Sequence, residues 1–224
     1  MANVVKICGL STPEALDAAL AAGADLVGFV RFPKSPRHLE LEPGRALSER
    51  ARGYALRVAL LVDPDDAELE RTVAALDPDL LQLHGRETPA RVRAIRARFG
   101  RPVMKAIGIA DAADVPAISA YRACVDRVLL DAKPPRTAEA LPGGNGLPFD
   151  WRLLAGLDPS VSFMLSGGLN AANVTAAIAL TGARAVDVSS GVESRPGQKD
   201  PAQIEAFIRV ARAAWAASEQ RAPA

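Results

Sequence analysis

The sequence lacks an apolar run long enough to span a membrane, and no basic segment with an apolar stretch behind it opens the chain. We therefore expect neither a membrane-spanning helix nor a secretory signal peptide. Only two cysteines are present, Cys8 and Cys124, which is too few for a disulfide framework. A reducing cytoplasm is the expected location. The formal net charge is only +1, so nothing indicates a nucleic acid or a membrane as partner.

A dinucleotide-binding fingerprint is also missing. The first apolar run, Val4–Cys8, is followed by Gly9-Leu10 and not by G-x-G-x-x-G. This absence argues against a doubly wound open sheet of the type that binds nicotinamide or flavin dinucleotides.

What the sequence does contain is a regular alternation of short apolar runs and amphipathic segments. The apolar runs predict strands over Val4–Cys8, Leu26–Val30, Leu56–Val62, Leu80–Leu83, Val103–Ile107, Arg127–Leu130, Ser162–Leu165 and Ala185–Val188. The segments between them predict helices over Thr12–Ala22, Pro43–Arg52, Asp65–Leu76, Thr88–Phe99, Asp111–Ala120, Asp150–Leu157, Ala171–Thr181 and Pro201–Ala217. Ser11 or Thr12, Asn170 and Asp200 are expected to cap the helices that they precede.

Eight strand–helix units in a chain of 224 residues predict a single (β/α)₈ barrel, the TIM-barrel fold. We assign residues 1–217 to one barrel domain and residues 218–224 to a frayed tail. The one long irregular stretch, residues 134–148, follows the sixth strand. A domain boundary at this stretch would leave too few residues for a second hydrophobic core. We therefore interpret the stretch as a loop over the active site.

Two chemically reactive side chains close predicted strands: Cys8 ends the first and Asp131 ends the sixth. In a barrel of this kind the carboxyl ends of the strands line the active site. A thiol and a carboxyl group there are suited to act as general base and general acid. A strand cysteine is more often a small buried apolar residue, and we keep that interpretation for Cys124. For Cys8, nearby Lys6 or backbone N–H groups would favour a thiolate.

Glycine-rich loops follow the last two strands. Ser166-Gly167-Gly168-Leu169-Asn170 comes after the seventh and Ser189-Ser190-Gly191-Val192 after the eighth. Glycines let backbone N–H groups approach an anion, and barrels commonly bind phosphate at these two positions. Together the loops predict a small phosphorylated substrate.

Other polar residues end strands or follow them closely. Arg37 lies on a loop stiffened by Pro33 and Pro36, where its guanidinium would suit a substrate carboxylate. His84 and Asp187 are expected to line the site, although hydrogen bonding within the protein and turn capping are ordinary roles for them. Aspartates 63, 65 and 66 are interpreted as helix-capping residues and not as metal ligands.

Several motifs, in order along the chain to Asp200, resemble those of the phosphoribosylanthranilate isomerase family of tryptophan biosynthesis. They are Lys6-Ile7-Cys8-Gly9, Gly28-Phe29 with Pro33-Lys34-Ser35-Pro36-Arg37, Leu81-Gln82-Leu83-His84-Gly85, Leu129-Leu130-Asp131, Phe149-Asp150-Trp151, Leu165-Ser166-Gly167-Gly168-Leu169 and Val186-Asp187-Val188-Ser189-Ser190-Gly191-Val192-Glu193.

The resemblance implies a barrel that uses no metal and no organic cofactor and that catalyses an Amadori rearrangement. It places the general base on Cys8, the general acid on Asp131 and the contact to the anthranilate carboxylate on Arg37. It places the phosphate contacts on the amides around Gly167, Gly168, Ser190 and Gly191. Leu147-Pro148 departs from the basic-polar pair expected in the loop of the family. A small phosphorylated molecule is the expected partner, and a monomer is favoured.

Three alternatives remain open at this stage. A Schiff-base aldolase on the same barrel would use a strand lysine, with Lys6 and Lys105 as candidates. The related sugar-phosphate isomerase of histidine biosynthesis carries an aspartate where Cys8 stands, although dual specificity stays possible. A barrel that only binds a phosphate ligand or a partner would not need Cys8 and Asp131 together.

Overall fold

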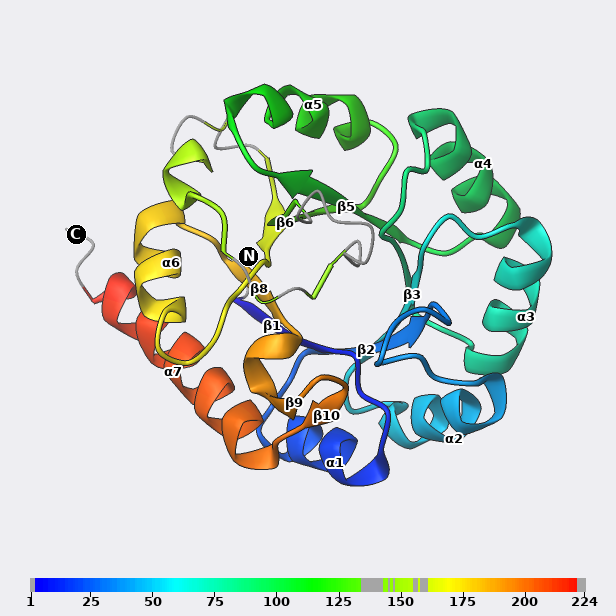
Figure 1. Ribbon diagram of the computed structural model, residues 1–224, viewed down its shortest axis with the longest axis horizontal. Helices are drawn as coiled ribbons and strands as arrows, with labels where there is room; N and C mark the ends of the chain where they lie inside the picture. Colours follow the sequence, from blue (N-terminus) through cyan, green and yellow to red (C-terminus); the bar gives the residue numbers. More distant parts are fainter. Residues whose placement is uncertain are drawn as a thin grey trace.

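The computed structural model describes residues 3–133, 143–144, 146, 148–154, 157 and 161–220. Within them, eight parallel strands pair in chain order, and β8 pairs with β1 to close the barrel. The view down the barrel in Figure 1 shows these strands around the axis and the helices outside them. The strands are β1 Val4–Cys8, β2 Leu26–Arg31, β3 Leu56–Leu61, β4 Leu80–Leu83, β5 Val103–Ile109, β6 Arg127–Ala132, β7 Phe163–Leu165 and β8 Ala185–Val188. The predicted (β/α)₈ barrel is confirmed.

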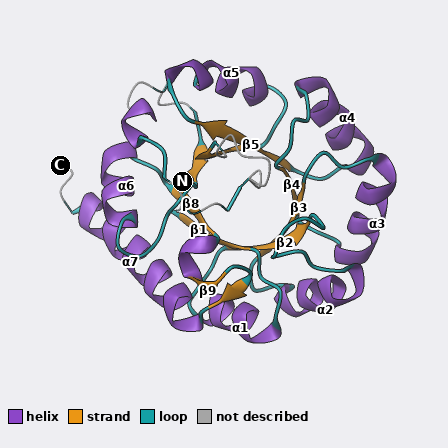
Figure 2. Cartoon of the chain, viewed as in Figure 1, coloured by secondary structure: helices purple, strands orange, loops and turns teal. Residues whose placement is uncertain are grey.

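Helices follow most strands and form the outer ring (Figure 2). The α-helices are α1 Pro13–Ala21, α2 Leu41–Ala51, α3 Asp66–Leu76, α4 Pro89–Phe99, α5 Pro116–Arg122, α6 Val174–Thr181 and α7 Pro201–Glu219. Short 3₁₀ helices are η1 Ala112–Asp114, η2 Trp151–Leu154 and η3 Ser190–Val192. After η3 comes a small antiparallel hairpin of β9 Glu193–Arg195 and β10 Gln198–Lys199.

Three predicted helices were wrong in extent. The segment Asp150–Leu157 contains only the 3₁₀ helix η2 among its described residues. The helix predicted over Asp111–Ala120 is divided, because Pro116 has no N–H for a continuous helix and instead begins α5.

The start of α6 was also predicted too early. Asn170 Oδ1 accepts hydrogen bonds from the backbone N–H groups of Ala172 at 2.9 Å and Asn173 at 3.2 Å. It therefore caps a turn, and the helix itself begins at Val174. Thr12 and Asp200 do cap α1 and α7 as predicted. Helix α7 continues to Glu219, two residues into the segment expected to be a tail, of which residues 221–224 lie outside the described part.

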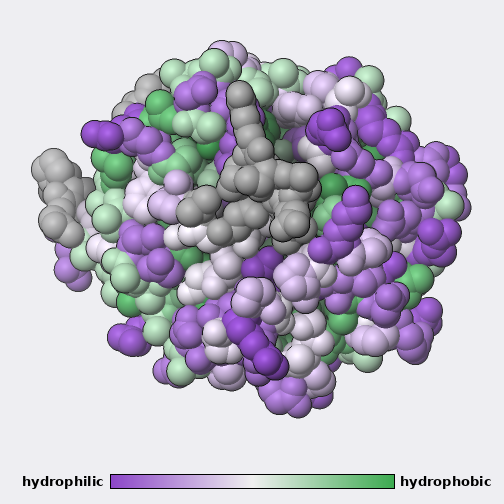
Figure 3. Space-filling model, in the orientation of Figure 1, coloured by the Kyte–Doolittle hydropathy of each residue, from purple (hydrophilic) through white to green (hydrophobic). Residues whose placement is uncertain are grey.

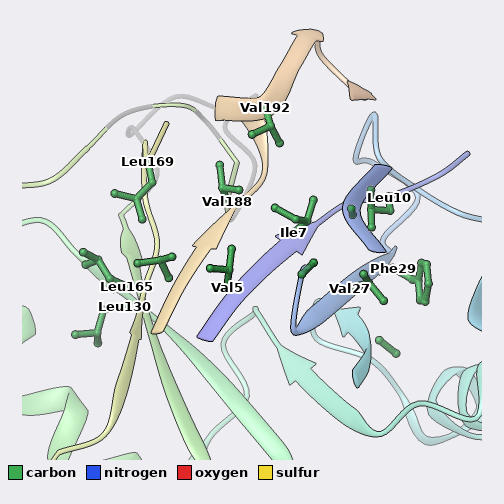
Figure 4. Packing of buried hydrophobic residues seen from close by; sticks show 14 of the residues in the cluster. Val5, Ile7, Leu10, Val27, Phe29, Leu130, Leu165, Leu169, Val188 and Val192 are labelled. Carbon is green, nitrogen blue, oxygen red and sulfur yellow. The ribbon is translucent and has the colours of Figure 1, made fainter. Parts of the chain in front are cut away.

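The core has two parts because side chains alternate between the two faces of each strand. Residues facing outward, such as Val5, Ile7, Val27 and Phe29, pack under the helices (Figure 4). Residues facing inward near the amino ends of the strands form a separate apolar cluster that includes Leu26, Leu80, Met104, Leu129 and Met164. This cluster fills the lower barrel, so the interior is open to polar chemistry only at the carboxyl ends.

The outer surface over α3 and α4 is mainly hydrophilic (Figure 3). Arg91 and Arg98 of α4 both pair with Asp66 of α3. Asp65 caps α3 by accepting from the N–H of Glu68 at 2.7 Å, the role expected of it. No helix in the described ranges is long and apolar enough to cross a membrane.

Candidate active site

Strand β1 places two reactive side chains inside the barrel, one above the other. Lys6 and Cys8 are two residues apart and so share the inward face. The register puts Lys6 opposite Asp187 of β8, and Lys6 Nζ lies 2.7 Å from Asp187 Oδ1. Ser166 Oγ donates to Asp187 Oδ2 at 3.1 Å. A buried ion pair therefore lies beneath the thiol.

The Cys8 side chain is buried, and its surroundings act on the thiol in opposite directions. Burial raises the pKa of the Cys8 thiol, the ammonium group of Lys6 opposes that rise, and Asp187 adds to it. The net direction is upward, so the resting group is the thiol. Lys6 does favour the thiolate as expected, but desolvation outweighs it.

Asp131 ends the inward row of β6 and meets two other elements. Its Oδ2 lies 3.1 Å from His84 Nε2, and His84 Nδ1 lies 3.0 Å from the amide nitrogen of Gln82. Gly143 covers this pair: a Cβ at that position would lie 2.6 Å from His84 Nε2 and 2.7 Å from Asp131 Oδ2. A side chain at position 143 would therefore displace His84 or Asp131.

Arg37 is buried, although a loop arginine is ordinarily solvated. Its backbone N–H donates to Ser35 Oγ at 3.1 Å, which fixes the loop after β2. Its guanidinium makes a double contact with Glu193, with Nε 2.7 Å from Oε1 and Nη2 2.8 Å from Oε2. The side chain is held rigidly at the edge of the pocket.

The two glycine-rich loops differ in backbone conformation. Gly167 and Gly168 have φ values of 83° and 63°, in the left-handed region that side chains disfavour. After β8, the chain forms η3 from Ser190. Successive N–H groups in such turns make anion-binding concavities.

Most of the predicted site residues line one pocket of about 790 Å³, its open mouth included. The predicted residues that line it are Cys8, Arg37, His84, Asp131, Gly167, Gly168, Asp187 and Ser190. Gly191 does not line it; a Cβ on that residue would collide with the carbonyl oxygen of Leu169. The remaining loop residues, 134–142, 145 and 147, lie outside the described part of the chain, and Leu147 of the noted Leu147-Pro148 departure is one of them.

Sequence reasoning missed the residues that hold this pocket together. Gln82 precedes His84 by two on an inward strand face, so alternation alone would have indicated it. Ser166 and Glu193 stood in the matched motifs without an assigned role. No sequence pattern indicated Lys199, which is buried beside Glu193. Its contacts depend on how the β9–β10 hairpin folds back onto the barrel.

The lysines proposed for a Schiff-base aldolase do not face the pocket. Lys6 lies below Cys8 and pairs with Asp187. Lys105 points out of the barrel and pairs with Glu87 at 3.0 Å, with its ammonium 5.6 Å from the ring centre of Tyr121. Lys133 reaches the pocket mouth but pairs with Asp114 at 2.7 Å. No group of three or more metal-ligating side chains gathers in the described ranges.

The fold and this pocket define a (β/α)₈-barrel protein whose pocket is lined by a thiol, a carboxyl group, an arginine and two glycine-containing loops. A family model described as "N-(5'phosphoribosyl)anthranilate (PRA) isomerase" matches residues 5–210. The chain belongs to the N-(5'-phosphoribosyl)anthranilate isomerase family. The resemblance read from the motifs is confirmed, as is the expectation of an isomerase.

Individual proteins similar to this chain bear the name of the same family. The protein named N-(5'-phosphoribosyl)anthranilate isomerase from Azorhizobium caulinodans is 61% identical over 218 residues, 97% of this chain and 95% of that protein. The solved phosphoribosyl anthranilate isomerase of Thermotoga maritima is 37% identical, with a TM-score of 0.83 over 95% of this chain and all of that one. Another solved isomerase, 34% identical with a TM-score of 0.81 over 95% of this chain and 100% of its own, is a complex with reduced 1-(o-carboxyphenylamino)-1-deoxyribulose 5-phosphate.

Proposed function

We propose that Cys8 and Asp131 are the general base and general acid of the reaction of this family. That reaction is the Amadori rearrangement of N-(5'-phosphoribosyl)anthranilate to 1-(2-carboxyphenylamino)-1-deoxyribulose 5-phosphate in tryptophan biosynthesis. The observation that carries the proposal is that both groups line one pocket, which also contains Arg37 and the two glycine-rich loops. Neither group needs a metal or an organic cofactor for proton transfer.

The substrate has two anionic ends, and the pocket has a counterpart for each. We assign the phosphate to the backbone around Gly167, Gly168 and Ser190, which line the pocket, with Gly191 allowing the turn to pack against Leu169, and the carboxylate to Arg37. Anchoring both ends would hold the sugar between the thiol and the carboxyl group, which replaces a bimolecular encounter with a fixed geometry.

The chemistry then needs two proton transfers. Asp131, carrying a proton, donates it to the ring oxygen, and the ring opens to a Schiff base. The Cys8 thiolate removes the proton from the second carbon of the sugar, and the resulting enolamine tautomerises to the ketone. Lys6 supports the thiolate by its charge. His84, 3.1 Å from Asp131, orients the acid.

Asp131→Asn separates the general acid from a structural role. Asparagine keeps the size of the side chain but delivers no proton, so kcat should fall about 10²–10⁴-fold. Binding of the open-chain product should change little. Loss of substrate fluorescence gives kcat, and titration with the reduced product gives the dissociation constant. Retained turnover together with a lower melting temperature would exclude Asp131 as the acid.

Two further proposals concern the whole protein. We propose a cytoplasmic enzyme, supported by the two unpaired, buried cysteines. We also propose a monomer with one domain over residues 1–217, since the exposed large apolar side chains in the described part are few, namely Tyr54, Leu56 and Leu180. Light scattering after gel filtration tests the mass, and a mass of twice 23.5 kDa would contradict the monomer.

A further inference from the structure

The partner of Arg37 is a residue to which sequence reasoning gave no role. Arg37 follows β2 and Glu193 begins β9, 156 positions later, yet both side chains are buried against each other. Glu193 takes the Nε and Nη2 edge of the guanidinium in a bidentate contact, with distances of 2.7 and 2.8 Å. Such paired contacts fix the plane as well as the position of an arginine.

Glu193 also ties this arginine to the loop after β8. Its Oε1 lies 2.7 Å from Lys199 Nζ, and its Oε2 accepts from the N–H of Gly197 at 3.2 Å. Lys199 Nζ donates in turn to the carbonyl oxygen of Ser189 at 2.9 Å and to its Oγ at 3.2 Å. One carboxylate thus connects Arg37 to the residue just before Ser190.

The hairpin that carries Glu193 and Lys199 lies against the loop of Arg37. A Cβ at Gly197, in the turn between β9 and β10, would collide with the carbonyl oxygen of Pro36. In Figure 1 the hairpin is drawn on the side of the barrel where β1 and α1 lie. The hairpin therefore acts as a spacer between the β2 loop and the β8 loop.

The charges of Arg37, Lys199 and Glu193 explain why the carboxylate of Glu193 matters. Burial opposes the charge of Glu193, but hydrogen bonds from Arg37 and Lys199 hold the pKa of its carboxyl below the usual range. Burial lowers the pKa of Lys199, and the charge of Glu193 counteracts this. With two cations and one anion, the cluster keeps one positive charge. That surplus is suited to a ligand carboxylate.

The contacts with Glu193 do not use Nη1 of Arg37, which faces Gly144; a Cβ at Gly144 would lie 2.6 Å from Nη1, so the glycine leaves room beside it. An arginine has five N–H donors, and Glu193 occupies the Nε side. The second Nη2 donor reaches the carbonyl oxygen of Gly144 at 3.3 Å. Within the described ranges, Nη1 donates to no protein acceptor, while Arg37 lines the pocket.

We propose that Glu193 is a positioning residue for substrate recognition. It holds Arg37 by the Nε edge, so that Nη1 faces the carboxylate of the substrate. Through Lys199 it also fixes the distance between Arg37 and the phosphate-binding loop after β8. This inference rests on the proposed role of Arg37 and adds to it, because it assigns the spacing between the two anionic ends of the ligand to one buried carboxylate.

Glu193→Gln is the first test, with two ligands. The reduced product, 1-(2-carboxyphenylamino)-1-deoxyribulose 5-phosphate, carries both anions, whereas ribose 5-phosphate carries only the phosphate. Losing one charged partner should raise the dissociation constant of the reduced product about 10- to 100-fold. The dissociation constant of ribose 5-phosphate should stay within about 3-fold, since its anchor does not use Arg37 and Lys199 keeps its own hydrogen bonds to Ser189 in the loop after β8. KM should rise much more than kcat falls.

Glu87→Gln is the matched control. Glu87 is, among the described residues, also a glutamate whose side chain is buried against a buried lysine, Lys105. Its loss should lower the melting temperature as Glu193→Gln does, without changing the ratio of the two dissociation constants. If Glu193→Gln does not fold, Glu193→Asp keeps the charge but is one methylene too short to serve both cations, and should give a smaller rise.

Equal weakening of both ligands, or no weakening of either, would overturn the proposal. In an Arg37→Ala background, Glu193→Gln should add less than about 2-fold for the reduced product, because the two residues act as a unit. Arg37→Ala alone also separates the two hypotheses. If it leaves the reduced product bound as before, the assigned role of Arg37 fails. If it weakens binding while Glu193→Gln does not, only the role of Glu193 fails.

Discussion

At Cys8, the surroundings that make a base possible also keep it protonated at rest. The side chain is only 3% exposed, so desolvation raises the pKa of the thiol. Lys6 lies below it on the same strand face and opposes that rise. The balance between these two effects sets the fraction of thiolate at each pH, and under the proposed mechanism that fraction is the active enzyme.

Removing the thiol tests whether it is the base. Cys8→Ala should lower kcat by about 10²-fold or more and leave KM within a few-fold, since general base catalysis contributes roughly that much. Cys124→Ala is the control, because Cys124 donates its S–H to the carbonyl oxygen of Tyr121, away from the pocket. Near-normal turnover of Cys8→Ala would return Cys8 to the role of a core residue.

The raised pKa of Cys8 predicts a pH profile. A base is active when deprotonated, so kcat/KM should rise with pH. The rise should be centred above the ordinary thiol value of about 8.5. Lys6→Met removes the charge that favours the thiolate and leaves Asp187 unpaired, and both changes should move the limb further upward. Thiolate absorbance at 240 nm measures the same titration directly. A limb below the ordinary value would contradict this account of the site.

At the scale of helices and strands, most of what the sequence predicted correctly concerns where helices start and where strands end. A serine, threonine or aspartate before a proline or an apolar run marks a helix start, because its side chain accepts from a free N–H group of the first turn. Thr12, Asp65 and Asp200 follow this rule. Asn170 follows it too, but for a turn that precedes α6.

Thr88 allows a measurement of one such cap. Its Oγ accepts from the N–H of Arg91 at 3.2 Å, at the start of α4. Thr88→Ala should lower the free energy of unfolding by about 1 kcal/mol. Thr88→Ser keeps the oxygen and should recover most of the loss. Urea unfolding of the unchanged protein, Thr88→Ala and Thr88→Ser measures these differences. Equal midpoints would mean that packing alone fixes the start of α4.

At the scale of the whole molecule, barrel closure decides which residues meet. Strand β1 pairs with β8, which brings the first and last reactive segments side by side. Lys6 and Asp187 are 181 positions apart and still form an ion pair. The closed sheet also separates its two ends: the carboxyl ends hold the pocket, and the amino ends hold the inner apolar cluster of Leu26, Leu80 and Met164.

This separation predicts the state of the cysteines. Cys8 lies at the carboxyl end of β1, whereas Cys124 precedes the amino end of β6. The two are then separated by roughly one strand length, about 15 Å, while a disulfide needs Cα atoms within about 7 Å. Thiol counting on denatured, unreduced protein should find both thiols free. An intramolecular bridge would contradict the topology.

The sequence by itself determined the fold class, the order of the strands and most of the residues that line the pocket. It could do so because strand alternation and strand ends are local properties: Cys8, His84 and Asp131 each close an apolar run, and glycines follow the last two runs. In a (β/α)₈ barrel the carboxyl ends of all strands lie at the same end of the barrel, where the active site is found. A residue that ends a strand is therefore placed near the site by its position in the sequence alone.

Only the tertiary structure decided how these residues act on one another. The pairing of Arg37 with Glu193 and Lys199, and of Lys6 with Asp187, joins segments far apart in the chain. The net direction of the Cys8 pKa depends on burial, which no local pattern reports. These contacts follow from the closure of the barrel and the folding back of the β9–β10 hairpin. Long-range geometry sets the distances on which electrostatic and hydrogen-bond energies depend.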